Sequence, residues 1–153
     1  MLGESPDQAE SRDEHTVGWL NGLEVLPRNE CLHRLAGESL GRLGVKLGAQ
    51  LSILPVNYVL RDERIVIRTE PGSKLSAAIM GTRVAFEVDA VELGEASGWS
   101  VLVNGRASEI RDHAGLEQAQ RLEVSPWAPG VRPRFVEIRI DQISGRSFGP
   151  REP

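Results

Sequence analysis

The feature that most constrains this chain is a regular alternation of apolar and polar residues between Arg134 and Ile143. The centre of this run reads, in order, Val136, Glu137, Ile138, Arg139, Ile140 and Asp141. Because successive side chains of a β-strand point to opposite faces, the apolar residues share one face and the charged residues share the other. This is the pattern of a half-buried antiparallel strand. The chain is therefore expected to build a sheet with one face against a core and the other in solvent.

Short apolar runs separated by turn residues predict the remaining regular structure. Five more strands are expected, at Ser39–Leu47, Gln50–Leu60, Arg64–Thr69, Thr82–Leu93 and Trp99–Ile110. Three short helices are expected, from Pro27 to Gly37, over Ser73–Met80 and over Asp112–Glu123, with Ser73 and Asp112 as capping residues. Short turns between successive strands favour antiparallel pairing, and six such strands often close into a barrel that hides their edges. The predicted fold is mainly β with short helices, built around a six-stranded antiparallel barrel.

The charge of the chain is concentrated at its N-terminus. The formal net charge is -4, and residues 1–15 contain five acids and one arginine. This segment alone accounts for the net charge, so the rest of the chain is neutral. We expect a disordered acidic tail at residues 1–15, a folded domain at 16–148 and a C-terminal tail at 149–153. A neutral domain offers no electrostatic footprint for nucleic acid or for an anionic membrane.

The same sequence predicts a cytoplasmic location. No apolar run approaches the roughly 18 residues of a membrane-spanning helix. The acidic N-terminus lacks the apolar core of a secretory signal. The single cysteine, Cys31, cannot form an internal disulfide, which agrees with a reducing compartment. We therefore expect a cytoplasmic protein whose partners include neither nucleic acid nor a membrane.

The sequence contains no recognised catalytic or metal-binding motif. The three histidines lie far apart, and none belongs to a metal-ligand spacing. Cys31 stands on the apolar face of the first predicted helix, which favours a buried structural thiol over a nucleophile. Glu87 and Asp89 share a face of one predicted strand, where a solvated or salt-bridged pair is favoured over a catalytic one. No catalytic residue and no metal site are therefore assigned.

The strongest candidate site lies between Arg68 and Lys74, where a strand ends, a Pro-Gly turn follows and a helix begins. A helix start offers free N–H groups to an anion. Arg68 adds a bidentate guanidinium group and Lys74 adds an ammonium group. Thr69 and Ser73 add hydroxyls. Together these groups could bind a phosphate monoester, and a capped helix with two exposed cations is an equally good interpretation of the spacing.

A second candidate is Leu54–Tyr58, inside the second predicted strand. Pro55 has no backbone N–H, so we expect it at a sheet edge or a bulge. Backbone amides freed at such a place could meet a planar heterocycle. The residues alone favour an ordinary edge strand.

Seven stretches of the sequence carry a family resemblance, in the family's order and over about residues 26–148. They are Glu30–Ala36, Gly41–Leu43, Leu54–Tyr58, Ile67–Leu75, Val84–Asp89, Gly98–Ala107 and Ile143–Arg146. These stretches resemble the pyridoxamine 5'-phosphate oxidase-like family of flavin-binding split barrels. The match is best to small bacterial members often called flavin-binding or nitroimidazole-resistance-like. The resemblance implies a six-stranded split barrel that works as a homodimer, with two FMN sites at the interface.

The resemblance also assigns roles to residues that match the family's motifs. One group would hold the FMN phosphate, a second would line the isoalloxazine ring through its backbone, and a third would come from the partner subunit. A fourth pair, late in the last strand, would also approach the flavin. The residues that would hold the phosphate are Arg68, Thr69, Ser73 and Lys74, and those that would line the ring are Val56, Asn57 and Tyr58. The partner subunit would supply Trp99 and Ser100, and the late pair is Gly145 and Arg146.

The activity that the resemblance implies is that of an FMN-dependent oxidoreductase acting on an unknown small molecule, with the flavin carrying hydride or electrons. Three alternatives stay open: a non-catalytic flavin-binding or sensing module, a reductase that uses the deazaflavin F420, and a barrel without a cofactor. The authentic oxidases carry a C-terminal arginine–histidine segment, whereas this sequence ends Gly145–Pro153 without a histidine. This departure argues against pyridoxamine phosphate as the substrate.

Overall fold

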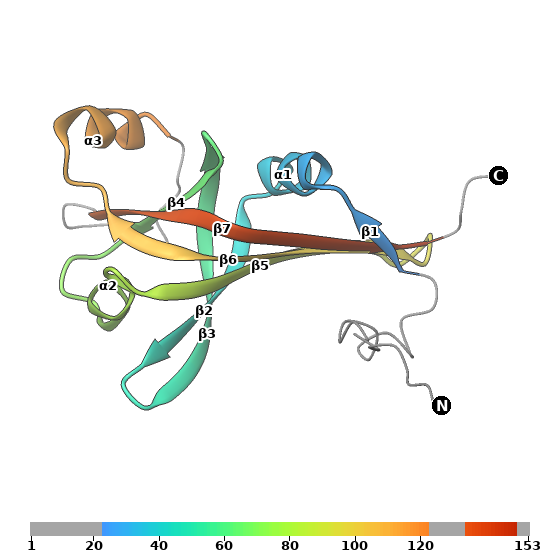
Figure 1. The fold of residues 1–153 in the computed structure, drawn as a ribbon, viewed down its shortest axis with the longest axis horizontal. Helices are drawn as coiled ribbons and strands as arrows, with labels where there is room; N and C mark the ends of the chain where they lie inside the picture. Colours follow the sequence, from blue (N-terminus) through green and yellow to red (C-terminus); the bar gives the residue numbers. More distant parts are fainter. Residues whose placement is uncertain (1–22, 123–133, 150–153) are drawn as a thin grey trace, which may run out of the picture.

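The computed structural model describes residues 23–122 and 134–149, and its ribbon is drawn in Figure 1. The strands are β1 (Glu24–Leu26), β2 (Leu40–Leu47), β3 (Gln50–Arg61), β4 (Arg64–Thr69), β5 (Arg83–Glu92), β6 (Ser97–Glu109) and β7 (Arg134–Phe148). The helices are α1 (Arg28–Gly37), α2 (Lys74–Ile79) and α3 (His113–Gln120). All six predicted strands and all three predicted helices are present, with shifted ends. The tail expected at residues 1–15 lies outside the described residues, as do residues 150–153 of the tail expected at 149–153.

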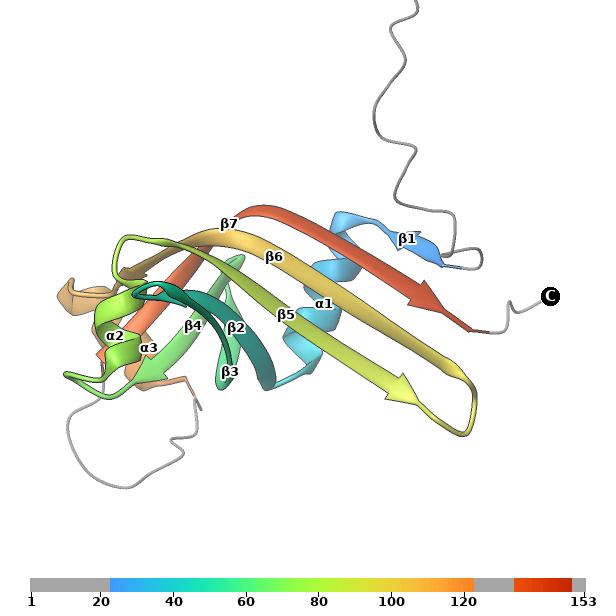
Figure 2. The same cartoon turned by 90° about the horizontal axis from the view of Figure 1, so that it is seen from below.

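Six of the strands close into a ring. Hydrogen bonding gives the order β7-β4-β3-β2-β5-β6, and a further pairing of β6 with β7 closes it. Every pairing in the ring is antiparallel. The predicted six-stranded antiparallel barrel is therefore confirmed. In Figure 2, β5, β6 and β7 extend side by side beyond the rest of the barrel, which gives the fold its elongated shape.

Strand β7 changes partner along its length. Its first half pairs with β4, from Arg134 opposite Thr69 to Arg139 opposite Arg64. Its last residues pair with the short strand β1 instead, while β6 runs along its other edge. The strand continues to Phe148, five residues beyond the end of the apolar–polar alternation at Ile143. Backbone pairing on both edges, rather than an apolar pattern, holds residues 145–147 in the strand.

The barrel interior is a continuous apolar core closed at one end by α1. The rings of Phe86 and Tyr58 meet edge to face, with centroids 4.9 Å apart. The Tyr58 hydroxyl donates a hydrogen bond of 2.6 Å to the carbonyl of Leu35, which ties α1 to the barrel. Cys31 is buried on the same helix, and its thiol contacts the carbonyl of Leu26. The predicted buried thiol is therefore confirmed, and its burial raises the pKa of Cys31.

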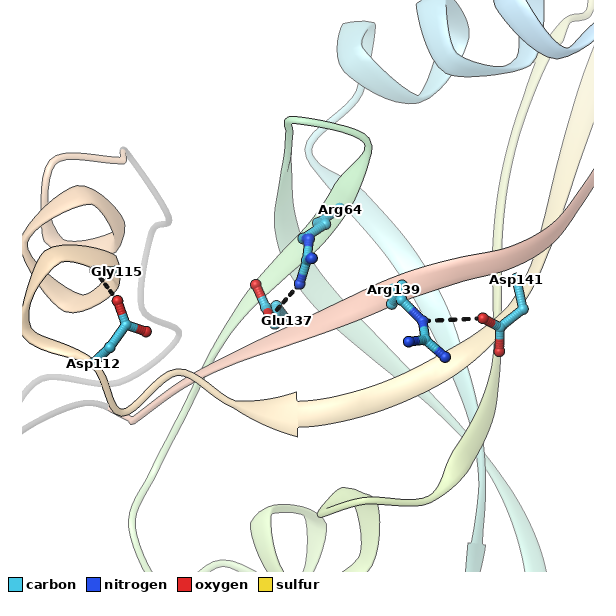
Figure 3. Close-up of polar contacts among 6 residues, drawn as sticks. All are labelled: Arg64, Asp112, Gly115, Glu137, Arg139 and Asp141. Atoms are coloured by element: carbon cyan, nitrogen blue, oxygen red, sulfur yellow. Dashed lines mark hydrogen bonds and ion pairs between the residues drawn. The ribbon is translucent and has the colours of Figure 1, made fainter.

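Helix α3 covers part of the outer face of the barrel. Ala119 on α3 packs with Val66 of β4 and Phe135 of β7, and these three residues form a small second core. This contact explains why Val66 is buried although it faces away from the barrel interior. Asp112 caps the helix as predicted, because its carboxylate accepts a hydrogen bond of 2.7 Å from the Gly115 N–H (Figure 3).

Candidate functional site

Arg68 and Thr69 end β4 and point to opposite faces of the sheet. Thr69 is buried on the barrel side, where its hydroxyl donates a long hydrogen bond of 3.4 Å to the carbonyl of Arg134. Arg68 projects from the outer face and is half-buried. The two residues therefore do not present their side chains to one ligand from the same face, and only Arg68 points outward.

Arg68 differs from most arginines of the described chain. Arg42 and Arg64, for example, each contact at least one carboxylate. Within residues 23–122 and 134–149, Arg68 has neither an ion pair nor a hydrogen bond from its side chain. A half-buried guanidinium without a partner is energetically costly, because its donors have lost part of their water. Arg68 is thus a donor group that an external anion can satisfy.

The turn that follows carries Ser73 and Ser76. The Ser73 hydroxyl accepts a hydrogen bond of 3.0 Å from the Ser76 N–H, so Ser73 caps α2 as predicted. Lys74 is the first residue of α2. The Ser76 hydroxyl is buried and has no hydrogen-bond partner among the described residues. A buried hydroxyl without a partner is rare, and it suits a site that another polar group completes. Ser76 could not be singled out from the sequence, because serine is common in short helices.

Strand β3 brings Val56, Asn57 and Tyr58 beside the end of β4. Tyr58 pairs with Ile67, so Asn57 lies next to Arg68 in the continued register, on the outer face. Val56 and Tyr58 are buried on the barrel side, where the Tyr58 hydroxyl already binds α1. Their side chains therefore belong to the core, and only their backbone is left for the ring contact that the resemblance implies.

Pro55 lies on the part of β3 that has β2 as its neighbour on one side and no strand on the other. Its Cα partner on β2 is Arg42, whereas pairing with β4 begins only at Tyr58. The Tyr58 N–H points toward β2, where it bonds the Ser39 carbonyl. Because backbone groups alternate along a strand, the nitrogen of Pro55 points to the open edge. The expected edge position is confirmed.

A second group of candidate residues lies on the long β5–β6–β7 extension. Ser100 pairs with Asp89 on one side and with Arg146 on the other, so these three side chains share one face. With Trp99 and Phe148, they line a shallow pocket of about 260 Å³. The Arg34 guanidinium lies 5.3 Å from the centroid of the Trp99 ring. The structure thus brings Ser100 and Arg146 together on one face, whereas the side chain of Trp99, the neighbouring residue of β6, lies on the opposite face against α1.

Gly145 belongs to the packing beneath α1 and β1. A Cβ at this position would lie 2.6 Å from the Cys31 sulfur and 3.1 Å from the Leu26 side chain. Real Cβ atoms do not approach sulfur so closely, so the glycine permits the helix to pack against β7. The structure gives Gly145 a packing role that the sequence did not indicate.

The two groups of candidate residues lie at opposite ends of β7. Thr69 pairs with Arg134 and Trp99 pairs with Ser147, so thirteen residues of β7 separate the groups (Figure 1). At ~3.3 Å per residue, the separation along the strand is about 43 Å. One small ligand cannot touch both groups within a single chain.

Glu87 and Asp89 form a salt-bridged pair, as predicted. Arg42 donates hydrogen bonds of 2.8 Å to Glu87 and 2.9 Å to Asp89 across the β2–β5 pair. Partial burial raises the pKa of Glu87 and the neighbouring Asp89 carboxylate adds to the effect, while Arg42 opposes both. The bridging guanidinium explains how two carboxylates can share this face.

Glu87 is expected to make the protein less stable as the pH rises. Its raised pKa means that the folded protein keeps a proton over a pH range in which the unfolded chain has lost it. The stabilisation is present below the ordinary pKa of glutamate and is lost as the pH passes the raised value. Urea unfolding of the wild type and of Glu87→Gln across this range isolates the contribution, because other groups cancel in the difference. If the difference in unfolding free energy between the two proteins did not change with pH, the predicted contribution of Glu87 would be contradicted.

Two further properties of the described residues bear on function. No helix in residues 23–122 and 134–149 is long and apolar enough to cross a membrane. Within the same residues, no cluster of three or more histidine, cysteine, aspartate or glutamate side chains is placed to hold a metal ion.

The closed antiparallel ring, with three strands that continue beyond it, defines a split β-barrel. The family model described as pyridoxamine 5'-phosphate oxidase matches residues 27–147. The chain belongs to this family. The resemblance found in the sequence is therefore confirmed, and it covers nearly all of the described residues.

Similar proteins of known sequence or structure agree with this assignment. The Mycobacterium tuberculosis protein Rv0080 is 33% identical over 125 residues, which cover 78% of this chain and 82% of that protein. The FAD binding protein of Mycobacterium smegmatis is 35% identical, with a TM-score of 0.75, covering 84% of this chain and 100% of that chain. An FAD-binding protein of Mesorhizobium loti is 29% identical, with a TM-score of 0.67, covering 82% and 97% of the two chains.

Proposed function

We propose that this protein binds a flavin nucleotide, FMN in the first instance, and that Arg68 anchors the flavin phosphate. The observation that carries the proposal is the half-buried Arg68 side chain, which has no partner among the described residues. The unpartnered Ser76 hydroxyl in the adjoining turn supports it. Two structurally similar proteins of 35% and 29% identity are FAD-binding proteins, which favours a flavin here.

The residues beside Arg68 suit the other parts of such a ligand. A guanidinium group donates two parallel hydrogen bonds to a phosphate, and Ser73 and Lys74 would complete the phosphate group's contacts. The open edge of β3 near Pro55 exposes backbone to a planar ring. A bound flavin would supply hydride and electron transfer, while the protein contributes binding and orientation.

We also propose that the protein is a homodimer in which each flavin site uses both subunits. About 43 Å along β7 separates the residues proposed to hold the phosphate from Trp99, Ser100 and Arg146. A second copy in the opposite orientation would bring them to the flavin held by Arg68. Five large apolar side chains in the described chain are more than half exposed, which supports an interface: Val25 at 70%, Leu51 at 87%, Ile53 at 75%, Val91 at 56% and Leu93 at 90%.

The spectrum of the purified protein tests the flavin proposal. A yellow protein with flavin absorption, together with mass spectrometry of the released cofactor, would identify FMN and separate it from FAD and from F420. A colourless protein whose titration with all three compounds produces no spectral change would contradict the proposal. Light scattering during size-exclusion chromatography tests the dimer, and a monomer that binds flavin stoichiometrically would contradict the shared site.

Among flavin-dependent functions, we favour an oxidoreductase acting on a small molecule. Reduction of the bound flavin by NADPH or NADH, followed by reoxidation with an added acceptor, would support this activity. A non-catalytic sensing module is the second candidate, since the described residues place no acid–base pair beside Arg68. Bound flavin that neither reductant can reduce would favour the sensing module.

A further inference from the structure

A row of five arginines crosses five neighbouring strands of the barrel. The strand register places each arginine directly opposite the next, in the order Arg61, Arg64, Arg139, Arg106 and Arg83. Directly opposed side chains share a face of the sheet, so all five project outward. Like charges in such positions repel and destabilise the sheet, so packing gives no reason for the row.

The charge of this row is balanced at one end and not at the other. Arg61 contacts Asp62, and Figure 3 shows Arg64 reaching Glu137 and Arg139 reaching Asp141. Arg106 contacts no carboxylate among the described residues and donates to the backbone carbonyl of Gly81.

Arg83 is the last member of the row. It is exposed and has neither an ion pair nor a side-chain hydrogen bond within the described chain. The excess positive charge therefore lies at the β5–β6 end of the row.

A surface cleft of about 720 Å³ opens at this end. Arg83, Arg139 and Asp141 line it, together with the amide side chains of Asn104 and Gln142. A volume of several hundred cubic ångströms is typical of a small-molecule site. The cleft therefore combines guanidinium donors, neutral hydrogen-bonding groups and a single carboxylate.

A β-bulge shapes the cleft. Asn104 pairs with Gln142 and Gly105 pairs with Ile140, so Asp141 is an extra residue in β7. The bulge needs a glycine, because a Cβ at position 105 would lie 2.1 Å from the Arg139 carbonyl oxygen. Bulges redirect side chains and are frequent beside functional sites. Here the bulge puts Asp141 within 3.2 Å of Arg139, where it holds that guanidinium at the edge of the cleft.

We propose that this cleft binds a small phosphorylated metabolite, with Arg83 and Arg139 as donors to its phosphate. Arg83 provides a free guanidinium, Arg139 is held in place by Asp141, and two guanidiniums against one carboxylate leave a net positive charge for a phosphate. The cleft spans β5, β6 and β7, whereas Arg68 lies at the end of β4 on the far side of β7. The proposed site is therefore distinct from the flavin site.

Calorimetric titration of the full-length protein tests the proposal with AMP, ribose 5-phosphate, inorganic phosphate and adenosine. We expect AMP or ribose 5-phosphate to bind more tightly than inorganic phosphate, and adenosine to bind at least tenfold more weakly than AMP. Arg83→Gln should weaken binding of the phosphorylated ligand by about tenfold or more, since a charged hydrogen bond is lost. Arg83→Lys should give an intermediate loss, because it keeps the charge but not the planar fork.

The controls separate this site from a general charge effect and from the flavin site. Arg121 is exposed at the end of α3, and Arg121→Gln should bind the ligand like the wild type. Arg83→Gln should melt no lower than the wild type, because it removes a repulsion, and it should keep its flavin affinity. Failure of every phosphorylated probe to bind would overturn the proposal, as would equal affinity for AMP and adenosine or for AMP and inorganic phosphate. An equal loss in Arg121→Gln, or a parallel loss of flavin binding in Arg83→Gln, would also overturn it.

Discussion

Replacing Arg68 and Lys74 together by alanine is expected to weaken flavin binding by at least about a hundredfold. Each charged hydrogen bond to the phosphate contributes roughly 1.5–3 kcal/mol, and the double variant removes both cations. Fluorescence quenching of free flavin on titration with each protein measures the affinity directly. The fold should survive, because Arg68 has no partner to lose among the described residues.

The matched control for this prediction is Lys46→Ala. Lys46 is the other lysine of the chain, and it is exposed near the end of β2. We expect this variant to bind flavin like the wild type, which would exclude a nonspecific effect of net charge. If the double variant retained full affinity, the phosphate would lie elsewhere in the molecule.

Replacing Phe86 by alanine is expected to destabilise the barrel by about 3–5 kcal/mol. Phe86 has no exposed surface, and its ring packs against Tyr58, whose hydroxyl connects the barrel to α1. The loss combines the transfer of the ring and the cavity that remains. It is a large part of the roughly 5–15 kcal/mol that stabilises a typical domain. Urea unfolding followed by circular dichroism gives the value.

Two further substitutions provide comparisons for the stability loss expected of Phe86→Ala. Tyr58→Phe removes only the hydroxyl and leaves the Leu35 carbonyl without its donor, so a loss of about 1–2 kcal/mol is expected. Leu102 lies on the outer face of β6 and is 41% exposed, so Leu102→Ala should cost clearly less than Phe86→Ala. Equal losses for Leu102→Ala and Phe86→Ala would show that the barrel interior does not dominate stability.

Local pattern was sufficient to predict most of the fold. The alternation in 134–143 identified the core-facing side of β7, and the turn residues at 61–63 separated β3 from β4. Period and turn chemistry are properties of neighbouring residues, so they can be read without knowing the partner strand. The capping residues Ser73 and Asp112 were predictable for the same reason.

Features that depend on pairing between distant segments could not be predicted from the sequence. Residues 144–147 contain no apolar side chain, and only their pairing with β6 and β1 makes them a strand. The three residues of β1 are too few to show a period. The arginine row is invisible in the sequence, because its members lie between positions 61 and 139 and only the register aligns them.

The candidate site was predicted as a set of residues, and its arrangement came only from the structure. The spacing between Arg68 and Lys74 pointed to a phosphate, since both belong to one turn. That Thr69 and Arg68 face opposite sides follows from the period of the strand. That Trp99 lies at the other end of the sheet follows from the order of strands in the ring, which no local pattern encodes.

The double role of β7 has a consequence for how the protein is made. Because β7 pairs with β1, β4 and β6, three strand edges stay unsatisfied until its residues have left the ribosome. Pairing of β4 with β7 also joins segments about 70 residues apart, which slows the closure of the ring. A nascent chain that stalls before residue 134 would expose these edges to other chains. Translation pauses upstream of β7 should therefore increase aggregation far more than pauses after it.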